Sequence, residues 1–192
     1  GTNVCGIAGR VNFLSGAPVD GAVVARMCDV IAHRGPDGHG THVVGPVGFG
    51  HRRLAIIDLS PLGRQPMASA DGALVVTFNG EIYNFQELRA GLEGLGHHFQ
   101  SHSDTEVILA AYRQYGDGCV TRLAGMFAFA LWDEPRRRLL IARDRLGKKP
   151  LYYRIDPDGL AFASEPKAFL ADPGFHPEVD LQSISQYLSY QY

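Results

Sequence analysis

Val4-Cys5-Gly6-Ile7-Ala8-Gly9, near the start of the chain, is the stretch from which the fold can be read. Its small and apolar residues predict a buried strand over 5–13, and its glycines predict close approach of another backbone. A free cysteine in such a strand is usually inert packing. It can also be a nucleophile held at the end of a sheet. The stretch alone does not decide between these two interpretations.

The composition excludes several classes of protein. The 192 residues are 45% hydrophobic and 20% charged, which favours one domain, or two small ones, of an ordinary soluble protein. The net charge of −2 provides no basic surface for nucleic acid or an anionic membrane. No apolar run approaches the roughly 20 residues that span a bilayer, and no signal peptide is visible. We therefore expect neither nucleic acid nor a membrane as a partner.

The cysteines and histidines do not form a metal-binding pattern. Cys5, Cys28 and Cys119 are odd in number and far apart, so they predict neither a disulfide framework nor a zinc site. The cluster of His97, His98 and His102 lacks a further ligand at a standard spacing, which favours solvated loop histidines. We expect a reducing, cytoplasmic setting and no metal.

The periodicity predicts strands at both ends of the chain, with helices between them. We expect helices that begin after Asp20, over 84–95, and after Ser103 or Asp104. The strand over 73–78 is expected to end at Asn79-Gly80-Glu81. The other expected strands are 5–13, 40–44, 47–53, 54–59, 126–132, 138–143, 151–155 and 160–163. This order favours an α+β fold of layered sheets covered by helices over a simple βαβ repeat.

Three polar residues and one glycine could assist a cysteine nucleophile, although each also has an ordinary structural explanation. Arg53 could form a structural ion pair, or its guanidinium could bind a substrate carboxylate bidentately. Asn79-Gly80 could be a turn, or it could supply one side-chain and one backbone N–H to an oxyanion. Asp104 could cap a helix or pair with an ammonium group. Taken singly, each residue favours the structural explanation.

Seven motifs nevertheless follow one another in order from Cys5. They are Cys5-Gly6-Ile7-Ala8-Gly9, His33-Arg34-Gly35-Pro36-Asp37, residues 51–58, Phe78-Asn79-Gly80-Glu81-Ile82-Tyr83-Asn84, Ser103-Asp104-Thr105-Glu106, residues 125–133 and Ala142-Arg143-Asp144-Arg145-Leu146-Gly147. Together they resemble the glutaminase domain of glutamine-hydrolysing asparagine synthetases. The same domain type occurs in glucosamine-phosphate synthases and amidophosphoribosyltransferases, but the second and third motifs look like the asparagine synthetase branch.

The resemblance implies a fold and a domain plan. The fold is an N-terminal-nucleophile (Ntn) hydrolase, an α+β, four-layer αββα sandwich of two antiparallel sheets. Residues 5–178 would form the glutaminase domain, and residues 1–4 would be the remnant of a tag or of the initiator. Residues 179–192 would begin an ATP-dependent synthetase domain, since an amphipathic helix starts near Asp180 and the sequence stops shortly afterwards.

The resemblance also implies catalytic roles, carried over by motif position. Cys5 would be the nucleophile that releases ammonia from L-glutamine through a thioester, leaving glutamate. Asn79 and Gly80 would form the oxyanion hole. The α-amine of an N-terminal cysteine, with a pKa of about 7.7–8.0, could serve as the base. Here Val4 precedes Cys5, so we expect this chain to be a poor glutaminase and a chain beginning at Cys5 to be competent.

Substrate-binding roles follow in the same way. Arg53 would bind the α-carboxylate of glutamine, while Asp104 and Glu81 would lie around its α-amino group. The remaining implied pocket residues are Leu54, Ile56 and Ile57.

The resemblance implies partners outside this domain. Ammonia would pass to a C-terminal synthetase domain of the same chain, which would convert aspartate to asparagine with ATP and Mg²⁺. No cofactor is expected in the glutaminase domain itself, and a homodimer is left open. Two alternatives remain: a glutaminase that supplies a different acceptor, or a catalytically silent scaffold domain.

Overall fold

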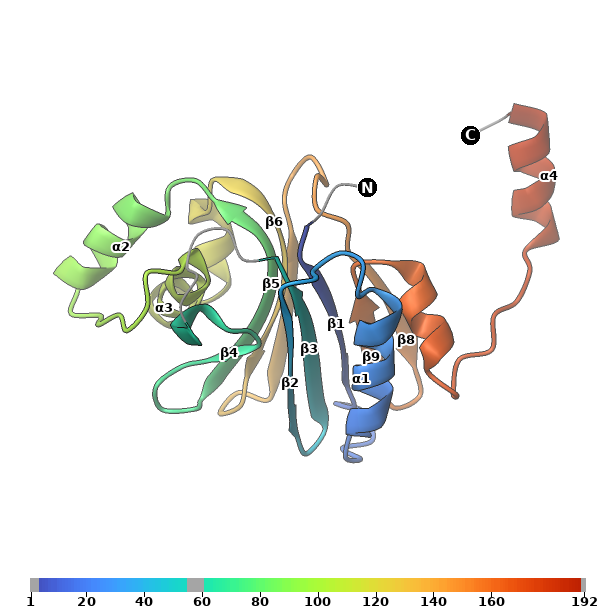
Figure 1. The fold of residues 1–192 in the computed structure, drawn as a ribbon, viewed down its shortest axis with the longest axis horizontal. Coiled ribbons are helices and arrows are strands. Elements are labelled where there is room, and N and C mark those ends of the chain that lie inside the picture. The colour runs from blue at the N-terminus through green and yellow to red at the C-terminus, as the bar shows by residue number, and fades with distance from the viewer. Residues whose placement is uncertain (1–3, 55–60, 191–192) are drawn as a thin grey trace.

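Two β-sheets lie face to face in the computed structural model, which describes residues 4–54 and 61–190 (Figure 1). One sheet has five strands in the order β2-β3-β1-β9-β8, and the other has four in the order β4-β5-β6-β7. Neighbouring strands pair antiparallel throughout. The strands are β1 (Gly6–Val11), β2 (Gly38–Val44), β3 (Val47–Arg53), β4 (Met67–Ala68), β5 (Leu74–Ile82), β6 (Gly125–Asp133), β7 (Arg138–Arg143), β8 (Tyr152–Asp156) and β9 (Gly159–Ala163).

Helices cover the outer face of each sheet (Figure 1). The α-helices are α1 (Gly21–Val30), α2 (Phe85–Gly94), α3 (Asp104–Tyr115) and α4 (Leu181–Tyr190), and the 3₁₀ helices are η1 (Pro61–Gly63), η2 (Gly116–Arg122) and η3 (Pro166–Ala171). Three apolar clusters separate the layers: α1 and η3 against the five-stranded sheet, the two sheets against each other, and the four-stranded sheet against α2, α3 and η2. The α+β, four-layer αββα sandwich predicted from the sequence is confirmed. Within the described residues, no helix has the length and apolar character needed to cross a membrane.

The opening stretch of the sequence forms the central strand of the five-stranded sheet. β1 lies between β3 and β9. Ile7 and Val11 are fully buried and pack between the sheets, whereas Ala8 faces the α1 side. A Cβ on Gly9 would lie 2.5 Å from the Phe162 ring and 2.7 Å from the Gly48 carbonyl oxygen. The predicted close approach at this glycine is therefore present, and it lets Phe162 fill the space beside the strand.

Most predicted elements are present; the end of one strand is corrected, and the cap of one helix is decided between the two predicted residues. β5 does not end at Asn79-Gly80 but runs on to Ile82, because β6 pairs with it along its whole length. Ser103 caps α3 through its hydroxyl and the Thr105 N–H, at 3.1 Å, while Asp104 is the first residue of that helix. The strand predicted over 54–59 lies almost wholly outside the described residues.

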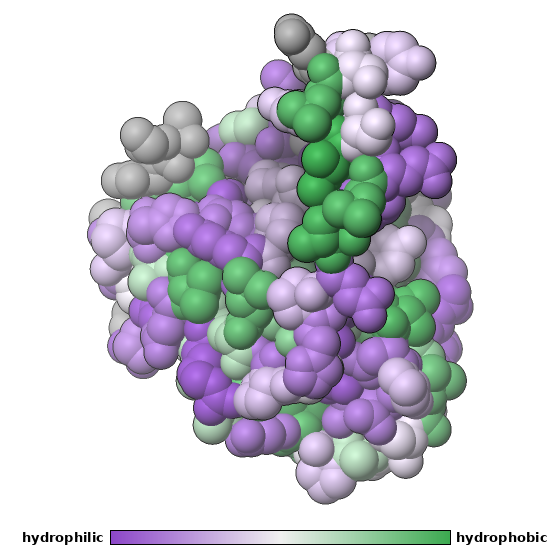
Figure 2. All heavy atoms as spheres, turned by 90° about the vertical axis from the view of Figure 1, so that its right-hand side faces the viewer, coloured by the Kyte–Doolittle hydropathy of each residue, from purple (hydrophilic) through white to green (hydrophobic). Residues whose placement is uncertain are grey.

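Helix α4 lies apart from the sandwich, at the end of an extended segment (Figure 1). Leu181, Ile184 and Leu188 are 76%, 46% and 72% exposed. Their spacing places them on one helix face, and that face forms an apolar stripe in the space-filling view (Figure 2).

Candidate functional site

Cys5 lies just before β1, with backbone contacts that hold it from both sides. The Val4 N–H donates to the Arg34 carbonyl at 3.1 Å, and the Arg34 Nε donates to the Cys5 carbonyl at 3.0 Å. On the other side, the Leu54 N–H donates to the Cys5 Sγ at 3.3 Å. The half-buried thiol is therefore held in place at the end of the central strand.

Burial makes the Cys5 thiol less acidic than a free cysteine. Desolvation raises its pKa, and the nearby Asp104 carboxylate acts in the same direction. The Leu54 N–H and the positive charges of Lys149 and Arg53 oppose this effect only in part. Because the thiolate is the reactive form, Cys5 needs a base to act as a nucleophile at neutral pH.

Asn79 and Gly80 lie within β5, on the sheet opposite Cys5. The Thr77 hydroxyl donates to the Gly50 carbonyl across the gap between the sheets at 3.1 Å. Asn79 is two residues further along, so its side chain projects from the same face of β5, toward the five-stranded sheet. The Asn79 Nδ2 is buried and has no hydrogen-bond partner among the described residues. An unpaired buried donor is costly, and this is the arrangement that an oxyanion-binding group would require.

Arg53 and Asp104 bring opposite charges to the same region from different layers. Arg53 ends β3, where the alternation of the strand places it on the same face as Phe49 and His51. Asp104 is 4% exposed, and its carboxylate accepts the Ile82 N–H at 3.0 Å. Burial raises the pKa of Asp104 to about 6, although the Ile82 and Thr105 N–H groups counteract part of this effect.

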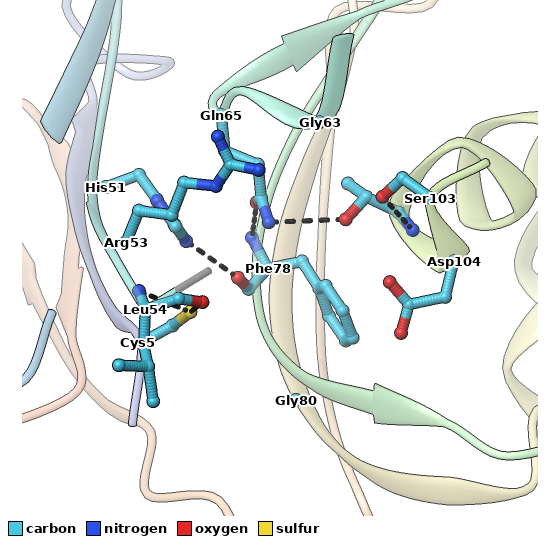
Figure 3. A pocket seen from close by; sticks show the side chains of 11 residues that line it. Cys5, His51, Arg53, Leu54, Gly63, Gln65, Phe78, Gly80, Ser103 and Asp104 are labelled. Atoms are coloured by element: carbon cyan, nitrogen blue, oxygen red, sulfur yellow. Dashed lines mark hydrogen bonds between the residues drawn. The ribbon is translucent and has the colours of Figure 1, made fainter. Parts of the chain in front are cut away.

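One pocket gathers most of the residues singled out in the sequence (Figure 3). Its walls include Cys5 and Leu54 at the five-stranded sheet, Gly80 on β5, Arg53 and Asp104. Asn79 and Glu81 are absent from its lining. Asn79 is buried, and the charge of half-buried Glu81 raises the pKa of Asp104. Ile56 and Ile57 lie outside the described residues.

The pocket also contains polar residues that the sequence analysis missed. His51, Gln65, Ser103 and Thr105 line it beside Cys5 and Asp104. The position of His51 could have been found, since it shares the two-residue period of β3 with Arg53. Ser103 and Thr105 flank Asp104 in the chain, so their motif could also have indicated them, whereas Gln65 joins the pocket only through contacts between distant segments. Across the part of the chain that the structure describes, no three His, Cys, Asp or Glu side chains are grouped so that they could hold a metal ion.

The pocket therefore combines a thiol, the Gly80 backbone as a potential oxyanion donor, a guanidinium and a carboxylate. The family model described as "Glutamine amidotransferase domain" matches residues 4–192. The chain belongs to this family. It is a glutamine amidotransferase domain, of the enzyme class whose members use the amide nitrogen of glutamine.

Two relatives of this amidotransferase domain are much longer proteins. It is 42% identical over 185 residues to "Asparagine synthetase [glutamine-hydrolyzing] 3" of Bacillus subtilis, covering 95% of this chain and 30% of that protein. It is also 44% identical over 158 residues to "Amidase chry2" of Gibberella zeae, covering 81% of this chain and 23% of that protein. The chain thus spans under a third of the length of these relatives.

A solved structure supports the fold of the amidotransferase domain independently. The glutamine phosphoribosylpyrophosphate amidotransferase from B. subtilis, complexed with ADP and GMP, superposes with a TM-score of 0.73 at 24% identity. The match covers 87% of this chain and 43% of that one. At this level of identity the likeness establishes the shared sandwich of two sheets.

Proposed function

We propose that this domain hydrolyses L-glutamine to glutamate and ammonia through a thioester on Cys5. The observation that carries the proposal is that the Cys5 thiol is held at the end of one sheet, while the facing sheet holds a buried Asn79 Nδ2 with no hydrogen-bond partner among the described residues. In the larger protein, the ammonia would serve the ATP-dependent conversion of aspartate to asparagine. The identity of 41–42% to glutamine-hydrolysing asparagine synthetases, over most of this chain, supports this choice of acceptor.

The reaction follows from the positions of these groups. The Cys5 sulfur attacks the amide carbon of glutamine, and the carbonyl oxygen becomes an oxyanion. The Asn79 Nδ2–H and the Gly80 N–H stabilise this charge. Collapse of the intermediate expels ammonia and leaves a thioester, which water cleaves through a second oxyanion to give glutamate and the free thiol. Each nitrogen, oxygen and proton is accounted for by glutamine and one water.

The base is the α-amine of Cys5 in a chain that begins at this residue. Its pKa of about 7.7–8.0 lets it accept the thiol proton near neutral pH and return it to the departing ammonia. This role matters because burial raises the pKa of the thiol. An amide nitrogen, as in a chain where Val4 precedes Cys5, cannot take up that proton.

Recognition of the amino acid falls to the two charged residues of the pocket. Arg53 would bind the α-carboxylate of glutamine, and Asp104 would bind its α-ammonium group, with Glu81 adding negative charge nearby. Leu54 would form part of the wall along the side chain. Opposite charges on two layers would orient the γ-amide toward Cys5 and exclude amides that lack the amino-acid head group.

We further propose that helix α4 is the first element of a C-terminal synthetase domain of the same chain. Its apolar stripe of Leu181, Ile184 and Leu188 is exposed, and the relatives are roughly three times as long as this chain. The domain boundary would then lie near residue 178. ATP and Mg²⁺ would bind in that synthetase domain, and a cytoplasmic location fits its substrates.

Glutamate release from L-glutamine tests the central proposal. We expect release by a chain that begins at Cys5, and none by its Cys5→Ala variant. A chain with Val4 before Cys5 should be much slower. Hydrolysis that survives the Cys5→Ala change would contradict the thioester route, and equal rates with and without Val4 would contradict the role of the α-amine.

A further inference from the structure

Three backbone N–H groups of β5 point away from β6, toward the pocket. The Phe78 N–H donates to the Gln65 Oε1 at 2.6 Å, and the Ile82 N–H donates to the Asp104 Oδ2 at 3.0 Å. In an antiparallel strand, alternate residues direct their N–H groups to the same side. The Gly80 N–H therefore lies between these two, on the pocket side of the strand.

Gln65 takes the position of a missing strand partner. The β4–β5 pairing joins Met67 to Val76, and the same register would place residue 65 opposite Phe78. β4 begins only at Met67, after Pro66, so the ladder ends before it reaches this point. The side-chain amide of Gln65, in place of a backbone group, accepts the Phe78 N–H (Figure 3).

The other end of the same amide reaches the helix that carries Asp104. The Gln65 Nε2 donates to the Thr105 Oγ1 at 3.2 Å (Figure 3). Thr105 follows Asp104, whose carboxylate holds the Ile82 N–H. The hydrogen bonds and the chain thus form a closed frame around Gly80, which consists of Phe78, Gln65, Thr105, Asp104 and Ile82. Of the side chains of this length, only an amide carries both a neutral acceptor and an N–H donor.

We propose that Gln65 is a positioning residue of the glutaminase reaction. It holds β5 so that the Gly80 N–H points at the oxyanion, and it ties that direction to the carboxylate that binds the substrate ammonium. This inference rests on the proposed function. Gln65 does not touch the reacting atoms; it acts through Phe78 on one side and Thr105 on the other.

The variant Gln65→Met keeps the length of the side chain and removes both hydrogen bonds. In a chain beginning at Cys5, we expect kcat for L-glutamine to fall about 100-fold, the effect of a small misplacement of a catalytic group. The KM should change far less, since Arg53 and Asp104 remain. Gln86→Met, the same change at an exposed position on α2, is the matched control and should leave both parameters unchanged.

Two measurements, one of thiol reactivity and one of ligand binding, distinguish a positioning role of Gln65 from a loss of structure. Alkylation of Cys5 by iodoacetamide should keep its rate in Gln65→Met, because the thiol is held by the other sheet. Cys28 and Cys119 are 3% and 0% exposed, and burial raises their pKa values to about 12 and about 11, so they will react slowly. The γ-semialdehyde of L-glutamate forms a thiohemiacetal that places an oxygen in the oxyanion hole. Relative to the unmodified chain, Gln65→Met should lose much more affinity for this aldehyde than for L-glutamate.

Thr105→Val provides a second variant that breaks only one side of the frame. It leaves the bond between Gln65 and Phe78, so we expect a smaller loss of kcat in the same direction. Unchanged kcat in a folded Gln65→Met protein would overturn the proposal. So would a parallel loss of kcat, alkylation rate and thermal stability, which would indicate a structural role. If the unmodified chain does not hydrolyse glutamine, the proposed function fails first and this inference fails with it.

Discussion

His51 on β3 donates its Nε2–H to the carbonyl of Phe78 on β5, at 3.1 Å, and so joins the two sheets beside the pocket. A carbonyl can only accept a hydrogen bond, so the Nε2 carries the proton. Burial is complete enough to lower the pKa of His51 to about 4, and the ring is neutral at neutral pH. The bond holds the strand that carries Asn79 against the strand that ends at Arg53.

The neutrality of His51 predicts a pH dependence of folding. Its pKa is lower in the folded state than the ordinary value of 6.5, so the unfolded chain binds a proton first as the pH falls. The contribution of this residue to the free energy of unfolding should therefore be at its maximum above pH 6.5 and should decline between pH 6.5 and 4. Urea titrations at several pH values measure it. His51→Gln, which can still donate to the carbonyl, should flatten this part of the profile, whereas His98→Gln on the exposed surface should not.

The Asn79 Nδ2, which has no hydrogen-bond partner among the described residues, predicts that a substitution will affect activity and stability differently. Asn79→Ala should lower kcat by about 10²–10³-fold, the usual effect of losing one oxyanion donor. It should cost little stability for a buried site, because the Nδ2 that it removes has no hydrogen-bond partner in the part of the chain that the structure describes. Glutamate release and thermal unfolding, measured on the same sample, test this. A large fall in melting temperature together with normal turnover would contradict the assignment.

The charge of Arg53 predicts an effect on binding rather than on turnover. Arg53→Ala should mainly raise the KM for L-glutamine, since it removes a partner of the α-carboxylate that is present in substrate and transition state alike. Arg53→Lys should restore the KM only in part, because an ammonium group cannot reproduce the two parallel bonds of a guanidinium. A fall in kcat with unchanged KM would contradict this role.

The close contact between β5 and β6 predicts that position 80 admits glycine alone. A Cβ there would lie 2.3 Å from the Met126 carbonyl oxygen and 2.7 Å from the Phe127 Cα, both backbone atoms that cannot rotate away. Gly80→Ala should cost about 1–3 kcal/mol of stability and most of the activity. Gly91→Ala, at an open position on helix α2, should instead stabilise the domain by about 0.5–1 kcal/mol. Similar melting temperatures for the two variants would contradict the contact.

The raised pKa of Asp104 predicts a pH dependence of substrate binding. Burial raises this pKa to about 6, so the carboxylate takes up a proton as the pH falls through that value. A neutral carboxyl group cannot pair with the substrate ammonium. The KM for L-glutamine should therefore rise below about pH 6, and Asp104→Asn should have a high KM that no longer varies in this range. A kcat that falls while the KM stays constant would assign Asp104 another role.

The sequence predicted those parts of the fold in which local pattern and tertiary contact agree. The alternation over 47–53 gave the bounds of β3 correctly, and the run over 138–143 gave those of β7. Asn79-Gly80 has the composition of a turn, yet it continues β5, because glycine lets β6 approach closely and the ladder extends to Ile82. Local propensity was overridden there by pairing with a distant strand.

The candidate site was predictable to the extent that its residues belong to recognisable motifs. Cys5, Arg53 and Asp104 do line one pocket. Gln65 could not have been found, since it belongs to none of the motifs and meets Thr105 only through a tertiary hydrogen bond of 3.2 Å. Such contacts depend on how the sheets and helices pack, which no short stretch of sequence encodes.

The thiol and its proposed oxyanion donors belong to opposite sheets, with His51 and Thr77 bridging the gap. Turnover would therefore depend on native packing between the two sheets. A partly folded, molten state could retain every strand and still be inert, since a loosened interface would separate Cys5 from Asn79. At low denaturant concentrations, glutaminase activity should be lost before circular dichroism shows any loss of secondary structure.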